Sequence, residues 1–235
     1  MTQRNRGKQS SDDRDFAAKW DNIFTEAAND LCFLLTRGYT SASALQLVGN
    51  RYKLNKRQRV ALMRICSSEQ EVEGRNKSIC PIDDLKGNTV EIDGFNLLIL
   101  LESALSGAYI FKGRDGTFRD ISSVHGSYKR VTQTEKAIYL IGEELKKIEV
   151  KTVKWYLDQP ISNSGRLKTR LMEISNESNF NFEVDLVFSP DKVLAESKQI
   201  VVSSDGWILD QAEKWFNLGV YLIEKHIPDV NLKVY

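Results

Sequence analysis

Aspartates are the residues of this sequence best placed to do chemistry, because three of them directly follow runs that predict β-strands. Asp93 closes VEID, Asp158 closes VKWYLD, and Asp205 follows IVVSS. In open α/β sheets, ligands bind outside the carboxyl ends of the strands. If these strands are parallel members of one sheet, their three carboxylates meet along one edge of it.

Carboxylates held close together repel one another, and a hard divalent cation is the usual remedy. Mg²⁺ or Mn²⁺ prefers oxygen ligands and retains several waters. Such a cation activates water and stabilises the charge that develops on a phosphodiester. We therefore predict that Asp93, Asp158 and Asp205 are metal ligands and catalytic residues of a phosphodiester-hydrolysing enzyme. Further catalytic residues, which would orient waters or ligands, are Asn96, Ser204 and Asp210.

Each aspartate also has a simpler interpretation. An Asp after a strand is often only the N-cap of the next helix, and Asp93-Gly94 is a common turn pair. Asp185 and Asp191 belong to a later strand and helix and are weaker candidates for the site. An acid at the position of Asp191 is typical of a first helical turn.

The composition excludes several other mechanisms. The chain has 33 Lys and Arg against 32 Asp and Glu, a net charge of +1, which excludes a uniformly basic nucleic-acid coat. The two histidines, His125 and His226, are too few for His-rich zinc chemistry. The three cysteines contain no Cys-x-x-Cys pair, so we expect reduced thiols and no structural zinc. They are Cys32, Cys66 and Cys80.

Motifs for other ligand classes and for membranes are absent from the sequence. Neither GxxxxGK[ST] nor GxGxxG occurs, which argues against a P-loop enzyme and against dinucleotide binding. The polar start lacks the apolar region of a signal peptide. The longest apolar stretch, 97–101, is far shorter than the roughly 20 residues that span a bilayer. We expect a cytoplasmic protein with no membrane partner.

The elements that must position the aspartates fall into two parts. Helical spacing of apolar residues predicts a basic all-helical module over 15–67, after a disordered tail over 1–14. A connector over 68–88 precedes an α/β domain over 89–235, in which a Rossmann-like parallel sheet is flanked by helices. Strands are predicted at 89–92, 108–111, 150–157, 182–188 and 199–202, and helices at 96–105, 134–147, 166–174, 190–196 and 211–224.

Binding a substrate with phosphates requires basic residues close to the site, because the net charge of the protein is near zero. Arg114 and Arg119 lie in a glycine-containing loop after a predicted strand, and Arg166 and Lys168 lie at a helix start after Asp158. Helix starts and arginines bind phosphates, so we expect these four residues to contact the substrate. The alternative is that the arginines form structural ion pairs with the acids.

The helical module has the strongest charge bias in the chain. Six basic residues and no acid lie between 51 and 64, and Arg57 and Arg64 share one face of a predicted helix. Such a face binds nucleic-acid phosphates without sequence preference, although a solvated face or one docked on an acidic neighbour is equally compatible. Four aromatic residues are predicted to be packed in the core rather than to stack on bases: Phe95, Trp155, Trp207 and Trp215.

The strand ending in DGFN, the later strand ending in Asp, and the segment SSDGWILD together resemble the PIN/NYN-like nuclease superfamily. This resemblance implies a Rossmann-like fold whose acidic residues bind Mg²⁺ or Mn²⁺ for RNA hydrolysis. Asp93 matches the first-strand aspartate and Asn96 its polar companion, while Ser204 and Asp205 match the late signature. Asp158 and Asp210 match less closely.

PIN domains carry an acid in a middle helix, and the candidates for it here are Glu135 and Glu102. Each of them could equally be an ordinary surface acid that binds no metal. The chain as a whole is more similar still to the domain-of-unknown-function 434 family. That resemblance extends over about 30–220 and includes the segments LLTRGYTSASALQLVGNRYKLNKRQRVALMR, EIDGFNLLILLESALSGAYIFKGRDG and WYLDQPISNSGRLK. It implies no activity.

The sequence therefore supports three hypotheses. The first is a metal-dependent ribonuclease with RNA or another nucleic acid as its partner, and a homodimer is one possible state of the protein. The second is a non-catalytic nucleic-acid-binding or protein-interaction module on a nuclease-like fold. The third is a small-molecule phosphohydrolase that acts on nucleotides.

Overall fold

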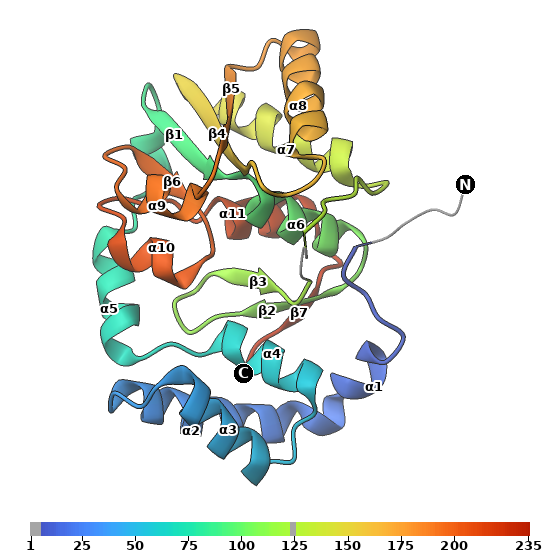
Figure 1. Ribbon diagram of the computed structural model, residues 1–235, viewed down its shortest axis with the longest axis vertical. Coiled ribbons are helices and arrows are strands. Elements are labelled where there is room, and N and C mark those ends of the chain that lie inside the picture. Colours follow the sequence, from blue (N-terminus) through green and yellow to red (C-terminus); the bar gives the residue numbers. More distant parts are fainter. Residues whose placement is uncertain (1–5, 123–125) are drawn as a thin grey trace.

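The computed structural model describes residues 6–122 and 126–235, and its main feature is a four-stranded parallel sheet (Figure 1). The strands lie in the order β5-β4-β1-β6. Their bounds are Thr89–Asp93 for β1, Thr152–Asp158 for β4, Phe182–Val187 for β5 and Ile200–Val202 for β6. The prediction of a parallel sheet flanked by helices and preceded by a helical region is confirmed.

Helices cover both faces of this sheet because successive strand residues point to opposite sides. In β4, Trp155 and Leu157 are buried in one core, whereas Tyr156 between them is buried in another. The first core includes residues of α6 (Gly94–Leu105), α7 (Thr134–Lys147), α8 (Ser164–Ser178) and α11 (Leu218–His226). The second includes residues of α9 (Pro190–Ala195) and α10 (Gly206–Gln211).

The strand order creates a switch point between β1 and β6. From β1 the chain adds β4 and then β5 on one side, and it returns to place β6 on the other side of β1. At such a point the connections leave the strand ends in opposite directions, which opens a crevice at the carboxyl edge. Asp93 and the residues after Val202 therefore lie where an open α/β sheet binds ligands.

The N-terminal region is helical, as predicted, but its boundaries differ. It comprises α1 (Asp12–Asp15), a 3-10 turn (Ala18–Trp20), α2 (Asp21–Thr36), α3 (Ser41–Arg51), α4 (Lys56–Ile65) and α5 (Glu69–Ser78). The stretch predicted as a connector over 68–88 thus contains a helix, α5, and a further 3-10 turn (Ile82–Leu85). The tail predicted as disordered is wrong in its last residues, because Asp12 begins α1 and accepts hydrogen bonds from Arg57.

A second sheet lies between the helical region and the main sheet domain (Figure 1). It has the order β3-β2-β7, from Phe118–Asp120, Tyr109–Lys112 and Asn231–Lys233. The run at 108–111 was expected in the parallel sheet and instead forms β2 of this smaller sheet. Alternation again explains the packing, since Phe111 is buried with the helical region while Ile110 and Phe118 are buried in the main core.

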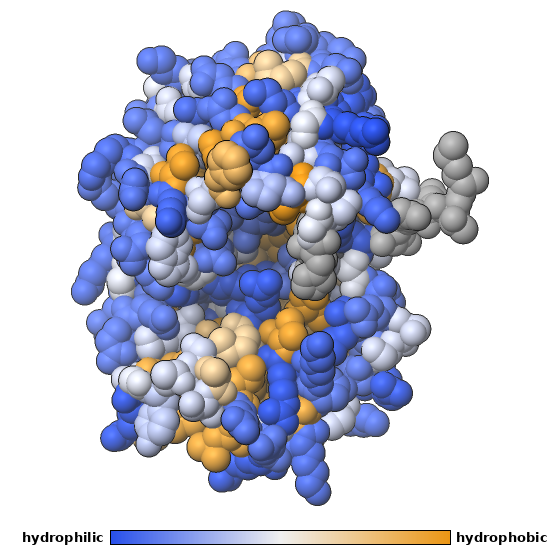
Figure 2. Space-filling model, viewed as in Figure 1, coloured by the Kyte–Doolittle hydropathy of each residue, from blue (hydrophilic) through white to orange (hydrophobic). Residues whose placement is uncertain are grey.

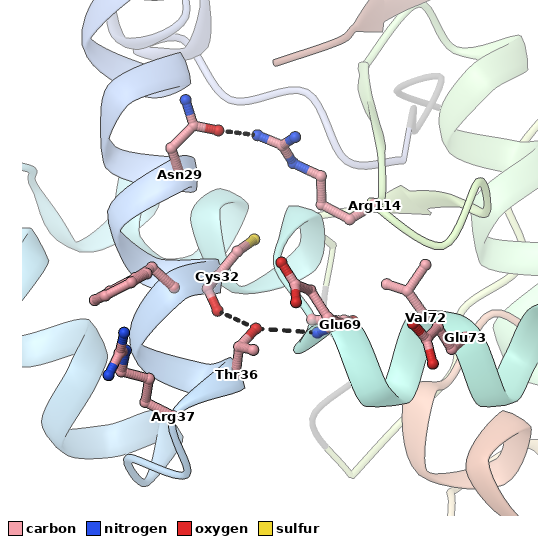
Figure 3. A pocket seen from close by; sticks show the side chains of 10 residues that line it. Asn29, Cys32, Thr36, Arg37, Glu69, Val72, Glu73 and Arg114 are labelled. Atoms are coloured by element: carbon pink, nitrogen blue, oxygen red, sulfur yellow. Dashed lines mark hydrogen bonds between the residues drawn. The ribbon is translucent and has the colours of Figure 1, made fainter.

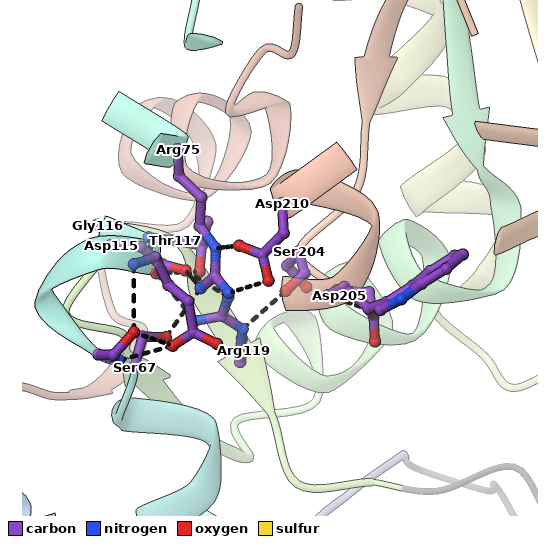
Figure 4. A network of polar contacts seen from close by, with 12 residues as sticks. Ser67, Arg75, Asp115, Gly116, Thr117, Arg119, Ser204, Asp205 and Asp210 are labelled. Carbon is purple, nitrogen blue, oxygen red and sulfur yellow. Dashed lines mark hydrogen bonds and ion pairs between the residues drawn. The ribbon is translucent and has the colours of Figure 1, made fainter. Parts of the chain in front are cut away.

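Buried ion pairs join the helical region to the rest of the chain (Figure 4). Arg75 of α5 donates to Asp115 Oδ2 at 2.6 Å and to Asp210 Oδ1 of α10 at 2.7 Å. Arg119 of β3 donates to both oxygens of Asp115, at 2.9 and 2.6 Å, and its Nε donates to the Ser204 carbonyl at 2.7 Å. We call Arg75, Asp115, Arg119 and Asp210 the arginine–aspartate network.

The electrostatics of Asp115 follow from these contacts. Burial by itself would raise the pKa of this carboxyl, but the guanidinium of Arg119, the Thr117 hydroxyl and Arg75 together hold the pKa well below its usual range. Asp115 is therefore charged at neutral pH, and together with Asp210 it balances the charges of the two buried guanidiniums.

The face of the molecule seen in Figure 2 is hollowed between the half that contains the main sheet and the half that contains α2, α3 and α4, and hydrophilic residues are visible in the hollow. Among residues 6–122 and 126–235, no helix has the length and apolar character needed to cross a membrane.

Removing Asp115 should destabilise the protein strongly. The change Asp115→Asn leaves Arg119 buried without its paired carboxylate and leaves Arg75 with Asp210 alone, and breaking a buried pair in this way costs about 3–5 kcal/mol. Urea-induced unfolding of purified protein measures the loss. The control is Glu149→Gln, which removes the exposed pair with Lys86 and should cost about 1 kcal/mol or less. Equal losses in both variants would contradict this role of the network.

Candidate functional site

Asp93 is the central residue of the candidate site. It ends β1, caps α6 and is only 7% exposed. Its Oδ1 accepts from the backbone N–H of Asn96 at 3.4 Å, and its Oδ2 accepts from the Ser203 hydroxyl at 2.9 Å. Gly94 follows it because a Cβ there would come within 2.9 Å of the Tyr156 carbonyl on β4. The strand end is therefore packed tightly against its neighbour.

The loop from β6 to α10 lies beside Asp93 and is held by side chains of α6. The Asn96 Oδ1 accepts from both the backbone N–H and the hydroxyl of Ser204, each at 2.9 Å. Asp205 caps α10 through Oδ1, which accepts from Trp207 N–H at 2.9 Å and from Ile208 N–H at 3.4 Å. Among the described residues, its Oδ2 has no hydrogen-bond donor.

Both aspartates are therefore helix N-caps, as the simpler interpretation predicted. Capping leaves both carboxylates with free lone pairs that can bind a ligand, since each carboxylate oxygen has two lone pairs. Asn96 and Ser204 contact one another rather than standing apart as separate ligands. The positions of Asp93 and Asp205 are thus fixed by the same hydrogen bonds that join β1, β6 and the helices after them.

The site contains four carboxylates that influence one another. Burial raises the pKa of Asp93 from 3.8 to about 7; the Ser203 hydrogen bond opposes this rise, and the negative charges of Asp191 and Asp205 add to it. Burial also raises the pKa of Asp158, and Asp191 raises it further. The pKa of Asp191 is raised by burial and by Asp205. The acids at the ends of β1, β4 and β6 therefore share one electrostatic environment with Asp191.

Within 6–122 and 126–235, these four carboxylates have no cationic partner. Among the described residues, no Lys, Arg or His forms an ion pair with Asp93, Asp158, Asp191 or Asp205, although Asp185 on β5 pairs with Lys154 at 3.5 Å. No group of three or more His, Cys, Asp or Glu within the described ranges is arranged as a ready-made metal site. The donors fit a hard cation that keeps most of its waters and takes one or two carboxylates, as Mg²⁺ does.

Sequence reasoning missed two residues of this site. Ser203 precedes the predicted Ser204-Asp205 pair and makes the direct contact with Asp93, which only the pairing of β6 with β1 reveals. Asp191 was treated as a weak candidate, because a first-turn acid after Pro190 has an ordinary explanation. Its charge nevertheless acts on Asp93 and Asp158.

Three residues predicted for the site or the substrate instead have structural partners. Asp210 pairs with Arg75, so its carboxylate faces the arginine–aspartate network (Figure 4). Arg119 is buried and pairs with Asp115. Arg57 pairs with Asp12 and donates to the Gly7 carbonyl at 2.8 Å. Arg119 thus forms the structural ion pair that was the alternative for it, and Arg57 docks on an acidic neighbour, which was an alternative for its helix face.

Other basic residues keep their charge available to a ligand. Arg166 is exposed at the start of α8, and Lys168 is half-buried on the same helix; neither has an ion pair among the described residues. Arg114 is exposed and donates to Asn29 Oδ1 at 2.6 Å. Arg64 lines a pocket of about 270 Å³ together with Arg75, Trp207 and Asp210.

Trp207 was predicted to be packed in the core, and this is wrong. Its side chain is 52% exposed, whereas Phe95, Trp155 and Trp215 are buried as expected. Glu102 is fully buried and accepts hydrogen bonds from Arg6, Tyr128 and Thr134, which gives it a structural role. Glu135 pairs with Arg170 at 2.8 Å. His125 lies outside the described residues.

Comparisons with known proteins define the family. Residues 82–221 match the family described as a domain of unknown function (DUF5616), and residues 23–77 match the family described as a protein of unknown function (DUF434). An uncharacterized protein of Methanocaldococcus jannaschii is 36% identical over 184 residues, which cover 78% of this chain and 88% of that protein. No solved structure matches the chain.

The chain therefore belongs to the DUF5616 family, with a DUF434 segment before it. The resemblance to the domain-of-unknown-function 434 family, expected over about 30–220, is confirmed in its N-terminal part. The candidate site itself lies in the DUF5616 part, because Asp93, Asp158, Asp191 and Asp205 all fall within 82–221.

The raised pKa of Asp93 should make stability depend on pH. Between about 4 and 7 the folded protein binds a proton at Asp93 that the unfolded chain has lost, so stability falls as pH rises through this range, by up to about 4 kcal/mol. Asp93→Asn should remove that part of the decrease, as urea unfolding at pH 5 and pH 8 would show. The exposed change Asp83→Asn should leave it intact. Parallel pH profiles for the wild type and Asp93→Asn would refute the assignment.

Proposed function

We propose that this protein is a divalent-cation-dependent ribonuclease with a PIN/NYN-like nuclease domain. The observation that supports it best is the convergence of Asp93, Asp158, Asp191 and Asp205 at the switch point of a parallel sheet, without cationic partners among the described residues. Mutual repulsion of this kind costs stability, and it is tolerated where a ligand neutralises it. A cation in the crevice is the ligand of matching charge.

Asp93, Asp158 and Asp205 would hold Mg²⁺ or Mn²⁺, one or two of them directly and the remainder through the cation's waters, with Asp191 nearby. The cation would activate water and stabilise the charge on a phosphodiester. The protein's own groups fix the geometry: Ser203 orients the Asp93 carboxylate, Asn96 holds the backbone of Ser204, and Arg119 holds the Ser204 carbonyl. These contacts keep Asp205 next to Asp93 before any ligand arrives, which is the preorganisation that electrostatic catalysis requires.

Basic and aromatic side chains near the acids would hold the nucleic acid. Arg166 at the start of α8 follows the loop after Asp158, so it is suited to a phosphate close to the acids. Trp207 comes two residues after Asp205 and is exposed beside Arg64. An exposed indole next to a cation is suited to stack on a base while the guanidinium binds the backbone. RNA rather than DNA is proposed on the strength of the PIN/NYN resemblance.

A non-catalytic nucleic-acid-binding module remains the second candidate, and one observation favours it. Within the described ranges, no three acids or other ligating side chains form a ready-made metal set. In that case the raised pKa of Asp93 keeps part of its carboxyl protonated and uncharged, so that it repels an approaching polyanion less. Turnover in the presence of a cation distinguishes the two functions.

Cleavage of RNA should depend on Asp93 and Asp205. Purified protein with Mn²⁺ should cleave labelled single-stranded RNA, and EDTA should stop the cleavage. Asp93→Asn and Asp205→Asn should each lower the rate by roughly 10²-fold or more, since each removes a charge from the reacting region. Asp185→Asn is the matched control, because that carboxylate pairs with Lys154 instead. Cleavage by both site variants at the wild-type rate would sink the proposal, whereas binding without turnover in the wild type would favour the second candidate.

Measurements of single-stranded RNA affinity should distinguish the contribution of base stacking on Trp207 from that of the Arg64 charge. Trp207→Ala should weaken binding by roughly 10-fold, as loss of one stacked base costs about 1–3 kcal/mol, and Trp207→Phe should retain it. Arg64→Ala should reduce the slope of log affinity against log salt by about 0.7, the value for one phosphate on a single strand. Arg170→Ala is the control, since its guanidinium already pairs with Glu135 and Glu173. Fluorescence anisotropy in EDTA measures all four variants, and unchanged affinity for Trp207→Ala would rule out the stacking role.

A further inference from the structure

Two cysteines that the proposed function does not use lie side by side in the helical region. Cys32 is on the fourth turn of α2, and Cys66 is the C-cap residue of α4. The Cys66 Sγ lies 3.5 Å from the Ala28 carbonyl, one helical turn before Cys32, and Cys32 packs against the buried cluster that contains Cys66, within hydrogen-bonding reach of its thiol. Residues far apart in the sequence thus bring two sulfurs close together.

Only one of the two thiols is accessible. Cys66 is 7% exposed, whereas Cys32 is half-buried and lines a pocket of about 680 Å³ between α2, α5 and the loop that carries Arg114. Figure 3 shows the Cys32 sulfur in the space between α2 and Arg114. The pocket has the size of a site for a small organic molecule. Arg37 and Arg114 line it, together with Glu69 and Glu73.

We propose that Cys32 and Cys66 are a reversible dithiol–disulfide pair that is oxidised by a low-molecular-weight disulfide entering this pocket. Cys32 is the attacking thiol and Cys66 is the resolving thiol. The arginines at the pocket suit an oxidant that carries carboxylates, as glutathione disulfide does. This inference is independent of the proposed ribonuclease function.

The electrostatic environment assigns these two roles. The hydrogen bond from Cys66 lowers the pKa of Cys32 to about 7 despite the opposing effect of burial, with further help from a backbone hydrogen bond of Ser67 and the charge of Arg114. The same contact with Cys32, together with burial, raises the pKa of Cys66 well above its usual value. Cys32 therefore carries thiolate at neutral pH, and thiolate is the nucleophile in disulfide exchange.

The reaction balances in two exchange steps. The Cys32 thiolate attacks one sulfur of glutathione disulfide, which forms a mixed disulfide at Cys32 and releases one glutathione thiolate. Cys66 then loses its proton to solvent, and its sulfur attacks the Cys32 sulfur to form the Cys32–Cys66 bond and release the second glutathione thiolate. The protein loses two electrons and two protons, and one glutathione disulfide becomes two glutathiones.

Cys80 provides an internal control. It is a buried free cysteine of the main core, its pKa is raised by burial and by Asp84, and its backbone N–H donates to the Trp215 carbonyl. No thiol contacts it among the described residues. It should not react under conditions that oxidise the pair.

The test is mass spectrometry of the folded, full-length protein after incubation with glutathione disulfide at pH 7.5, with free thiols alkylated before digestion. The wild type should lose two hydrogens and yield a cross-linked peptide of Cys32 and Cys66, which dithiothreitol reverses. Cys66→Ser should stop at a glutathione adduct on Cys32, and Cys32→Ser should form neither adduct nor cross-link. Cys80→Ser should behave as the wild type, and circular dichroism should verify that all variants are folded.

Three results would overturn the proposal. One is a wild-type protein in which both thiols remain alkylatable after the incubation. Another is an adduct on Cys80 with none on Cys32. The third is reaction of Cys32→Ser at the wild-type rate, which would show that another thiol is the nucleophile.

Discussion

The structure depends on a buried carboxylate that is shared by two guanidiniums. Asp115 accepts from Arg75 and Arg119, and all three side chains are almost inaccessible to water. In a low-dielectric interior, ion pairs of this kind are costly to assemble and costlier to break, since a lone buried charge remains. Because Arg75 comes from α5, Asp115 from the loop between β2 and β3, and Arg119 from β3, the helical region cannot move away from the small sheet without exposing a charge.

The same network extends to the candidate site. Arg119 donates to the carbonyl of Ser204, and Ser204 in turn donates to Asn96 beside Asp93. A rigid chain of hydrogen bonds therefore runs from the helical region to the edge of the main sheet, and it places the loop after β6 where Ser203 contacts Asp93. These hydrogen bonds hold the carboxylates together although their negative charges repel and raise one another's pKa. The free energy that this repulsion costs must be offset by packing elsewhere in the protein.

The sequence predicted the parts of this arrangement that depend on local patterns. Asp93 and Asp205 were identified because a β-branched run followed by Asp marks a strand end and a helix start. The helix α5 was missed, since EQEVEGRNKS has almost no apolar residues. Two polar interactions stabilise α5 instead. One is a capping box between Ser68 and Glu71, and the other is the burial of Arg75 against acids that are 40 and 135 residues away.

Contacts between distant residues account for the remaining differences. Arg119 and Arg57 looked like phosphate ligands because their nearest acids in space could not be identified from spacing. Trp207 looked like a core residue because aromatic side chains usually are, yet α10 turns it outward. The proximity of the Cys32 and Cys66 thiols likewise depends on how α2 meets the end of α4, which no local pattern encodes.

We expect the acids at the carboxyl edge of the sheet to bind a divalent cation. Anomalous diffraction from crystals of the wild-type protein grown with Mn²⁺ can locate such a cation. We expect an anomalous peak at the ends of β1 and β6, within about 2.0–2.6 Å of a carboxylate oxygen of Asp93 or Asp205. Strong Mn²⁺ peaks elsewhere, with none at these carboxylates, would contradict it.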